Sequence, residues 1–157
     1  MQILQTPNEF LKDFVLEINN AKQSVQIQSM NFETGKVMNI LTKVLINAAG
    51  RGVKIEINFD WVSQRYVHDT LPMFPVLSFK KRKYIKNLHM QNEDIINKLT
   101  KESVKMNQTN KPFFPLRTLP FMGRNHIKMY IVDKDFAWIG GLNLFDISFE
   151  NVDFMVK

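Results

Sequence analysis

The sequence contains no cysteine, and this absence excludes disulfide bonds and thiolate metal sites. It also lacks any run of eighteen apolar residues, so we expect no segment that spans a membrane. The stretch from Met1 to Pro7 has no basic segment followed by an apolar core, so we expect no secretory signal. With 157 residues, 45% of them hydrophobic, the chain is expected to form one domain over 1–157 with a sizeable core.

The first sixty residues carry alternating helix and strand signals. Thr6-Pro7-Asn8-Glu9 is typical of a capping box with proline at the first helical position, and it predicts a helix over 7–20. A strand is expected over 24–32, followed by an amphipathic helix that ends at Gly50 and a strand over 53–59. A helix between two strands implies that the strands are parallel, joined by a right-handed crossover.

The segment from about 64 to 124 differs from the rest in charge. It holds twelve lysines or arginines against four acidic residues, although the net charge of the whole chain is only +6. Apolar pieces broken by proline, 71–77 and 113–122, lie within it. Between them the pattern predicts a helix over 92–103 and a short strand over 104–106. We interpret the segment as a basic, partly apolar insertion.

This basic insertion suits a surface that meets anionic lipid headgroups and enters the acyl boundary. The same charge would also suit a nucleic-acid backbone. A third interpretation is that the run Lys80–Lys83 is only the solvated face of a helix. The neighbouring apolar pieces favour the lipid interpretation.

A motif with fixed spacing, H-x-K-x4-D-x6-G-G-x-N, lies near the end of the sequence. Its members are His126, Lys128, Asp133, Gly140, Gly141 and Asn143. The apolar residues around the first two predict a strand, bounded by the polar turn Lys134-Asp135 and followed by a second strand over 136–139. Residues two apart on a strand share a face, so we expect the histidine and lysine side chains to lie together.

These residue types suit chemistry at a phosphate. The imidazole of His126 can attack phosphorus, and Lys128 can offset charge on the phosphoryl oxygens. Gly140 and Gly141 would let the backbone approach a bound group closely, and Asn143 adds a neutral hydrogen-bond donor. Asp133 has the opposite strand parity from the histidine, so we interpret it as a residue that fixes the strand end and the turn.

The motif resembles the signature of the phospholipase D superfamily, in the form found in cardiolipin-synthase-like members, and the order of elements is similar over nearly the whole chain. The resemblance implies an α/β fold, a phospholipase D-like mixed β-sheet flanked by α-helices on both faces. It also implies a later acid that orients the histidine. Asp153, which opens an apolar strand, fits that position best, and Glu150 of the Glu150-Asn151 pair is the alternative.

By resemblance, the enzyme would be a phosphodiesterase or phosphatidyltransferase that acts on phospholipid through a phosphohistidine, with phosphatidylglycerol as the substrate of a cardiolipin-synthase-type reaction. No metal and no cofactor are expected. The alternatives are a nuclease of the same fold, with nucleic acid as the less favoured partner, and a catalytically silent half that dimerises or binds lipid. We expect a cytoplasmic protein in peripheral contact with an anionic membrane.

Only one copy of the motif is present, whereas active sites of this superfamily use two facing copies. The chain is therefore expected to need a second motif. The partner would be another half of the same protein, with this chain as the N-terminal half, or a second copy in a homodimer.

Overall fold

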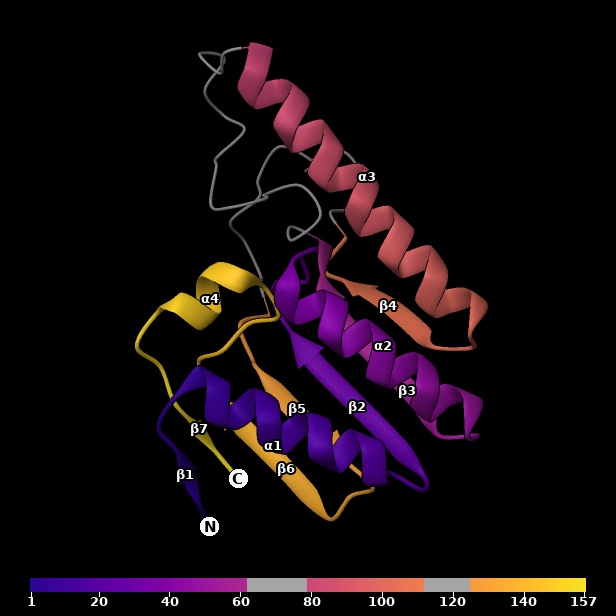
Figure 1. The fold of residues 1–157 in the computed structure, drawn as a ribbon, viewed down its shortest axis with the longest axis vertical. Coiled ribbons are helices and arrows are strands. Elements are labelled where there is room, and N and C mark those ends of the chain that lie inside the picture. Colours follow the sequence, from indigo (N-terminus) through magenta and orange to yellow (C-terminus); the bar gives the residue numbers. More distant parts are fainter. Residues whose placement is uncertain (62–78, 112–124) are drawn as a thin grey trace.

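A seven-stranded mixed sheet forms the centre of the computed structural model, which describes residues 1–61, 79–111 and 125–157 (Figure 1). The strand order is β1-β7-β6-β5-β2-β3-β4. The pairs β2–β3 and β3–β4 are parallel, and the other pairs are antiparallel. The strands are β1 (Ile3–Leu4), β2 (Ser24–Ser29), β3 (Lys54–Asp60), β4 (Lys105–Thr109), β5 (Met129–Val132), β6 (Phe136–Gly140) and β7 (Met155–Val156).

Four helices are described: α1 (Pro7–Asn20), α2 (Lys36–Gly50), α3 (Phe79–Lys101) and α4 (Asp146–Glu150). The predicted capping box at the start of α1 is confirmed. The Thr6 hydroxyl accepts a hydrogen bond from the Glu9 backbone N–H at 3.2 Å, and Glu9 in turn accepts one from the Gln5 N–H at 2.9 Å. The predicted helix ending at Gly50 and the parallel pair β2–β3 are confirmed as well.

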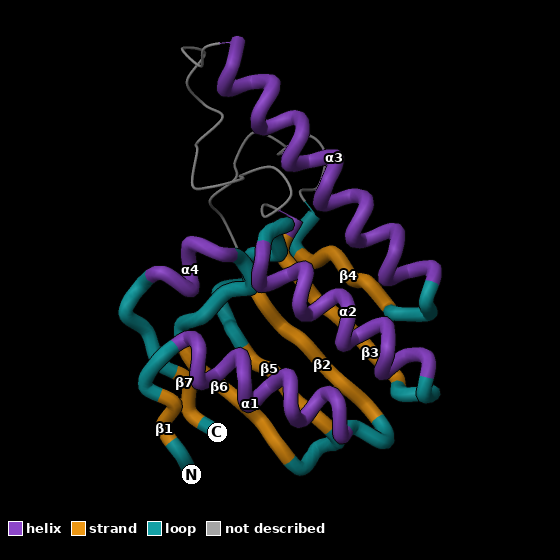
Figure 2. Tube along the Cα trace, viewed as in Figure 1, coloured by secondary structure: helices purple, strands orange, loops and turns teal. Residues whose placement is uncertain are grey.

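The helices pack as one layer. The contacts α1–α2, α2–α3, α1–α4 and α2–α4 join all four, and Figure 2 shows α1 and α2 crossing in front of the central strands. Strand burial alternates accordingly: Val25 and Ile27 of β2 are buried, whereas Gln26 between them is exposed. The predicted mixed, phospholipase D-like sheet is confirmed. Within the part of the chain that the structure describes, however, helices cover one face, because consecutive parallel crossovers place α2 and α3 on the same side.

The core between sheet and helices is rich in aromatic side chains. Phe10 and Phe14 of α1 stack at 5.4 Å between ring centroids and pack against Tyr130 of β5 and Trp138 of β6. All four are fully buried. These contacts seat α1 over the antiparallel half of the sheet and so fix the position of β5, which follows the histidine and lysine of the motif.

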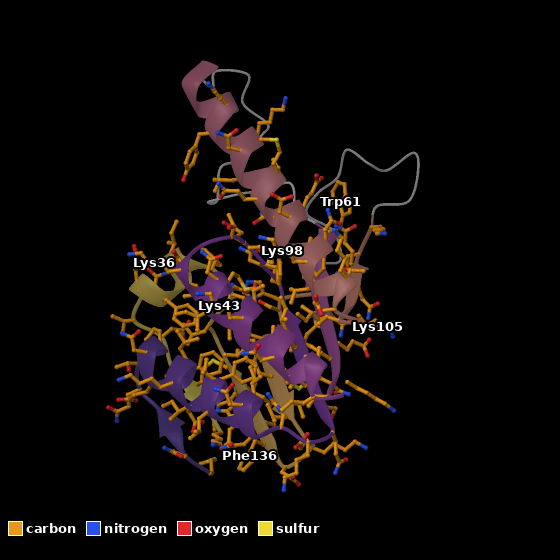
Figure 3. All side chains as sticks on the ribbon, turned by 45° about the vertical axis from the view of Figure 1, so that its right-hand side comes forward. Lys36, Lys43, Trp61, Lys98, Lys105 and Phe136 are labelled. Atoms are coloured by element: carbon orange, nitrogen blue, oxygen red, sulfur yellow. The ribbon has the colours of Figure 1, made fainter. Side chains whose placement is uncertain are left out.

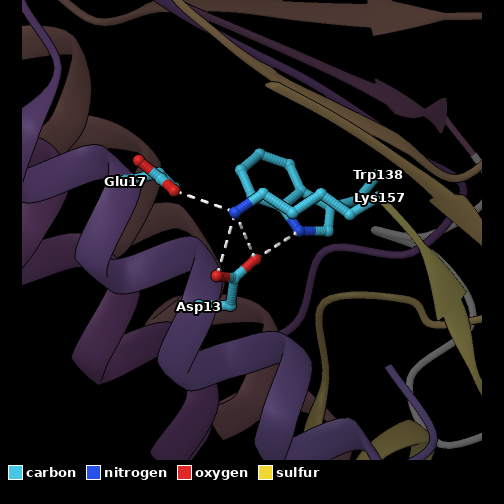
Figure 4. Close-up of polar contacts among 4 residues, drawn as sticks. All are labelled: Asp13, Glu17, Trp138 and Lys157. Carbon is cyan, nitrogen blue, oxygen red and sulfur yellow. Dashed lines mark hydrogen bonds and ion pairs between the residues drawn. The ribbon is translucent and has the colours of Figure 1, made fainter. Parts of the chain in front are cut away.

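The chain end that follows β7 is attached to α1 by a partly buried polar cluster (Figure 4). Lys157 forms ion pairs with Asp13 at 3.0 Å and with Glu17 at 2.8 Å. The Trp138 indole N–H also donates to Asp13 at 2.8 Å, and the Lys157 ammonium lies 5.1 Å from the Trp138 ring centroid. Burial lowers the pKa of Lys157, but the hydrogen bonds to Glu17 and Asp13 outweigh it and leave the pKa above its ordinary value.

The basic segment contributes to the sheet. Helix α3 begins thirteen residues before the predicted 92–103 helix. Strand β4 begins one residue later than the predicted 104–106 strand and ends three residues later. Helix α3 packs on the fold through a buried stripe formed by Leu88, Asn92, Ile95 and Leu99. The first half of α3 extends beyond the sheet (Figure 1). The proline-broken pieces 71–77 and 113–122 lie outside the described residues. None of the described helices is long and apolar enough to cross a membrane.

Candidate active site

The histidine and lysine of the motif lie together just before β5. The Lys128 ammonium is 2.9 Å from Nδ1 of His126 and donates to the His126 backbone carbonyl at 2.8 Å. The lysine is buried and the histidine is exposed, so the imidazole is open to solvent while the cation beneath it is held in place. The predicted pairing of the two side chains is therefore present, although regular strand structure begins one residue later, at Met129.

Burial lowers the pKa of the Lys128 ammonium, and the charge of Asp153 acts in the opposite direction. A protonated Lys128 donates to Nδ1 of His126, and the ring proton of a neutral imidazole then lies on Nε2. In this arrangement Nε2–H can donate a hydrogen bond, but a neutral ring is not an acid for a leaving alcohol. Nε2 becomes a nucleophile only when the ring proton moves to Nδ1, which requires an acceptor at Nδ1 in place of the ammonium.

Asn143 is oriented by the end of β2. Its Oδ1 accepts a hydrogen bond from the Asn31 backbone N–H at 3.2 Å and lies 3.3 Å from the Ser29 hydroxyl. Because Oδ1 is occupied, Nδ2 faces the other way, and it makes no hydrogen bond with any described residue. The buried Tyr130 hydroxyl donates to the Leu142 carbonyl at 2.6 Å and thereby holds the loop that carries Asn143 against β5.

The two glycines of the motif pack against the chain that enters β7. A Cβ at Gly141 would overlap the carboxylate of Asp153, and one at Gly140 would overlap the backbone carbonyl of Phe154. The absence of a side chain is thus required for the close approach of residues 153–155. The sequence had suggested a close approach to a bound group, and this remains a prediction.

The two candidate acids occupy different positions. Asp153 is partly buried, lies beside Gly141 and interacts electrostatically with Lys128. Its Oδ1 accepts a hydrogen bond from the Phe154 N–H at 2.8 Å. Glu150 is exposed on α4 and has no contact with the pair in the described part of the chain. The structure therefore brings Asp153 to the site, although neither acid is hydrogen-bonded to His126.

Asp133 lies at the far end of β5, after the strand has crossed the sheet. Its carboxylate accepts hydrogen bonds from the backbone N–H groups of Lys22, Gln23 and Ser24 at 2.7–2.8 Å. Partial burial raises the pKa of this carboxyl, but these three bonds and the Lys22 charge lower it by more, so that it lies below its ordinary value. Asp133 therefore fixes the β5–β6 turn to the start of β2.

Two acids that the sequence did not single out, buried Asp60 and partly buried Asp146, position the site. Asp60, at the end of β3, accepts a hydrogen bond from the Asn125 N–H at 3.3 Å and so anchors the segment that leads to His126. Asp146 accepts from the N–H groups of Lys36 and Val37, both at 2.9 Å, and caps α2 from across the fold. A signal for Asp60 existed, because ligand sites gather at the carboxyl ends of parallel strands. No local sequence pattern predicts the role of Asp146.

No three acidic or histidine side chains converge as a metal site in 1–61, 79–111 and 125–157. The chemistry that this arrangement offers is that of an exposed imidazole beside a buried cation and a free amide donor. Such a set suits an anionic oxygen centre such as a phosphate.

Solved structures with the same fold support the architecture. The phospholipase D family member Nuc from Salmonella typhimurium has a TM-score of 0.63 at 16% identity, and the similarity covers 98% of this chain and 78% of that chain. Phosphatidylserine synthase from Haemophilus influenzae Rd KW20 has a TM-score of 0.61 at 13% identity, covering 98% of this chain and 32% of that chain. The fold is that of a phospholipase D-like domain.

The chain belongs to the family described as cardiolipin synthase, PLD-like domain, whose sequence model matches residues 14–156. Among curated proteins, it is 25% identical over 146 residues to cardiolipin synthase A of Proteus mirabilis (strain HI4320). That similarity covers 93% of this chain and 26% of the relative, so the chain spans about a quarter of the relative's length. The resemblance drawn from the motif is thus confirmed.

Proposed function

We propose that this chain supplies one half of a phospholipase D-type active site that transfers or hydrolyses phospholipid phosphodiesters through a phosphohistidine. The observation that carries the proposal is the exposed imidazole of His126 held 2.9 Å from the buried ammonium of Lys128. The cardiolipin synthase A relative and the phosphatidylserine synthase neighbour favour a phospholipid substrate.

In the proposed reaction, Nε2 of one histidine attacks phosphorus, so that an N–P bond forms and the bond to the leaving alcohol oxygen breaks. The histidine of the second motif donates its proton to that oxygen. Water or an acceptor alcohol then attacks phosphorus, passes its proton to the same second histidine, and releases the first. Lys128 and the Asn143 amide would stabilise the phosphoryl oxygens.

The Lys128 contact at Nδ1 assigns neither role to His126, because the acid that protonates the leaving alcohol must be an imidazolium with protons on both nitrogens, and such a ring cannot accept from the ammonium. For the nucleophilic role, a carboxylate must replace the ammonium at Nδ1. Asp153 is the better placed acid, because it already lies beside Gly141 and interacts with Lys128, whereas Glu150 is exposed on α4.

Charge near the site supports an anionic substrate surface. The first half of α3 extends beyond the end of the sheet at which β2 and β3 terminate, which is also the end that carries His126 (Figure 1). Lys83 and Lys86 on it are exposed. Both an anionic membrane and a nucleic acid would bind such positive charge. The two alternatives are therefore distinguished by identifying the substrate.

The test is product analysis by mass spectrometry. The complete protein is incubated with phosphatidylglycerol vesicles and, separately, with DNA. We expect a phospholipid product and a phosphoryl adduct on a peptide that contains a motif histidine. His126→Ala and Lys128→Met should each lower turnover at least about 10³-fold, because the reacting imidazole or the charge stabiliser is lost.

Methionine is the better replacement at position 128 because this lysine is buried and its stem must be matched in volume. Ile127→Ala is the matched control, since Ile127 is 56% exposed and lies between the two residues. Cleaved DNA with unchanged lipid would assign the nuclease activity instead. Unchanged turnover in both variants would favour the alternative that this chain is a catalytically silent half.

A further inference from the structure

A second polar site lies at the opposite end of the sheet from His126. A cavity of about 770 Å³ is formed there by the N-terminal ends of β2, β3 and β4 together with the β5–β6 turn. We call it the lysine cavity, after Lys22, Lys54, Lys105 and Lys134, which line it. Cavities of this size hold small ligands. Lys128 precedes β5 and Lys134 follows it, so the two sites are separated by the length of β5, roughly 14 Å.

The lining of the lysine cavity is strongly positive. Its lysines come from four different parts of the fold, and Glu56 is the one acidic residue that lines it. Glu56 is already paired with Lys105 at 3.1 Å. Lys54 and Lys134 are exposed and form no ion pair with any described residue. The lining therefore carries more ammonium groups than carboxylates, although Glu56 is paired with Lys105 and the Asp133 carboxylate beside residues 22–24 interacts with the charge of Lys22.

The frame of the cavity consists of tight turns. Gly52, Ser103 and Lys134 all have positive φ, at 89°, 64° and 65°, which closes the connections α2–β3, α3–β4 and β5–β6 sharply. The first two turns are also held by backbone hydrogen bonds, from Gly52 N–H to the Ala49 carbonyl at 2.8 Å and from Ser103 N–H to the Thr100 carbonyl at 3.1 Å. The positions of the lysine backbones are thus fixed before any ligand binds.

The donors left for a ligand are side chains. The backbone N–H groups of residues 22–24 are already occupied by the Asp133 carboxylate. Besides the ammonium groups, the amides of Gln23 and Gln26 and the hydroxyl of Ser103 line the cavity. None of the described residues that line it is aromatic. A nucleobase would lack a stacking partner here, whereas a phosphate group would find several cationic donors.

We propose that the lysine cavity binds an anionic phosphate compound at a site separate from the reacting phosphodiester. The phosphate is that of a free polyphosphate-type anion or of a phospholipid headgroup, and both present the same oxygens to the lysines. Either ligand would hold the three turns and residues 22–24 together and so stabilise the end of the sheet that Asp133 also fixes.

The test measures binding of inorganic pyrophosphate to the full chain by calorimetry. The variant Lys54→Gln/Lys134→Gln removes two unpaired ammonium groups from the cavity. It should weaken binding at least about tenfold, since two charge-assisted contacts are lost. The control Lys43→Gln/Lys98→Gln makes the same change of net charge on helices α2 and α3, where Figure 3 shows both residues. It should change the affinity by less than about twofold.

Co-sedimentation with phosphatidylcholine vesicles, with and without phosphatidylglycerol, identifies the source of the phosphate. Loss of both pyrophosphate and phosphatidylglycerol binding in the cavity variant, but not in the control, supports a headgroup ligand. Loss of pyrophosphate binding alone supports a soluble ligand. Equal weakening in both variants, or no binding of pyrophosphate at millimolar concentration, overturns the proposal. Because the readout is binding, failure of the active-site proposal would leave this result unaffected.

Discussion

At the scale of single residues, the motif combines residues that have two different roles. His126 and Lys128 form a contact pair, and Asn143 presents a free amide to the same end of the sheet. Asp133 belongs to the same pattern but lies at the other end of β5, bound to three backbone N–H groups. One strand thus links a chemical site to a structural anchor.

The structural role of Asp133 should be visible in how the stability of Asp133→Asn depends on pH. The pKa of Asp133 lies below its unfolded value of about 3.9, so its stabilising effect is full above that pH and is lost as the pH falls through the folded-state pKa. We expect Asp133→Asn to lower the free energy of unfolding by about 1.5–3 kcal/mol at pH 7. The difference from the original protein should shrink below about pH 4.

Urea denaturation at pH 7, 5 and 3 measures the effect. Asp135→Asn is the control, because Asp135 is exposed in the same turn and its side chain makes no hydrogen bond to a described residue. A deficit for Asp133→Asn that is as large at pH 3 as at pH 7 would contradict the assigned role of the carboxylate.

The same residues show what the sequence can predict about a site. The pairing of His126 with Lys128 and the separation of Asp133 follow from strand periodicity, which is a local property. The anchoring of Asn125 by Asp60 and the capping of Lys36 by Asp146 join residues about 65 and 110 positions apart. No local pattern encodes such contacts, because they arise only when the elements have packed.

At the scale of elements, predictions succeeded where burial imposes a pattern. Helices α1 and α2 carry apolar stripes and clear ends, and their bounds agree with the prediction. The first half of α3 was missed, since residues 79–87 include the run Lys80–Lys83 and extend beyond the sheet, where no apolar stripe is required. Strand β4, Lys-Met-Asn-Gln-Thr, was placed only in outline because it is an edge strand with little apolar alternation.

The attachment of β7 to α1 gives a prediction at this scale. Lys157→Met should lower the free energy of unfolding by about 1–3 kcal/mol, because Asp13 and Glu17 would remain as adjacent, partly buried carboxylates without their cation. Lys12→Met is the control, since Lys12 lies on α1 beside Asp13 and forms no ion pair with a described residue. Thermal unfolding followed by circular dichroism measures both. Equal melting temperatures for the two variants would show that the cluster contributes nothing.

At the scale of the whole molecule, the sheet separates two regions of positive charge. Exposed Lys83 and Lys86 belong to the first half of α3, which extends beyond the end of the sheet with His126, and the lysine cavity lies at the other end. The face of the sheet away from the helices carries exposed Ile139 as well as polar Gln26. Among the described residues, His126 is the histidine beside the end of the sheet, and the proposed two-histidine reaction would require a second motif facing it.

That requirement gives the last prediction. The 157-residue chain should have little or no activity as a monomer, because one imidazole would have to serve as both nucleophile and acid.

If two copies assemble, activity should rise with the square of concentration at dilution. An equilibrated equal mixture with His126→Ala should then keep about one quarter of the activity of an all-original sample, because only that share of random pairs contains two intact histidines. Light scattering on the same samples gives the oligomeric state. Full activity from a demonstrated monomer would contradict the two-motif reaction, and half activity in the mixture would show that each copy acts alone.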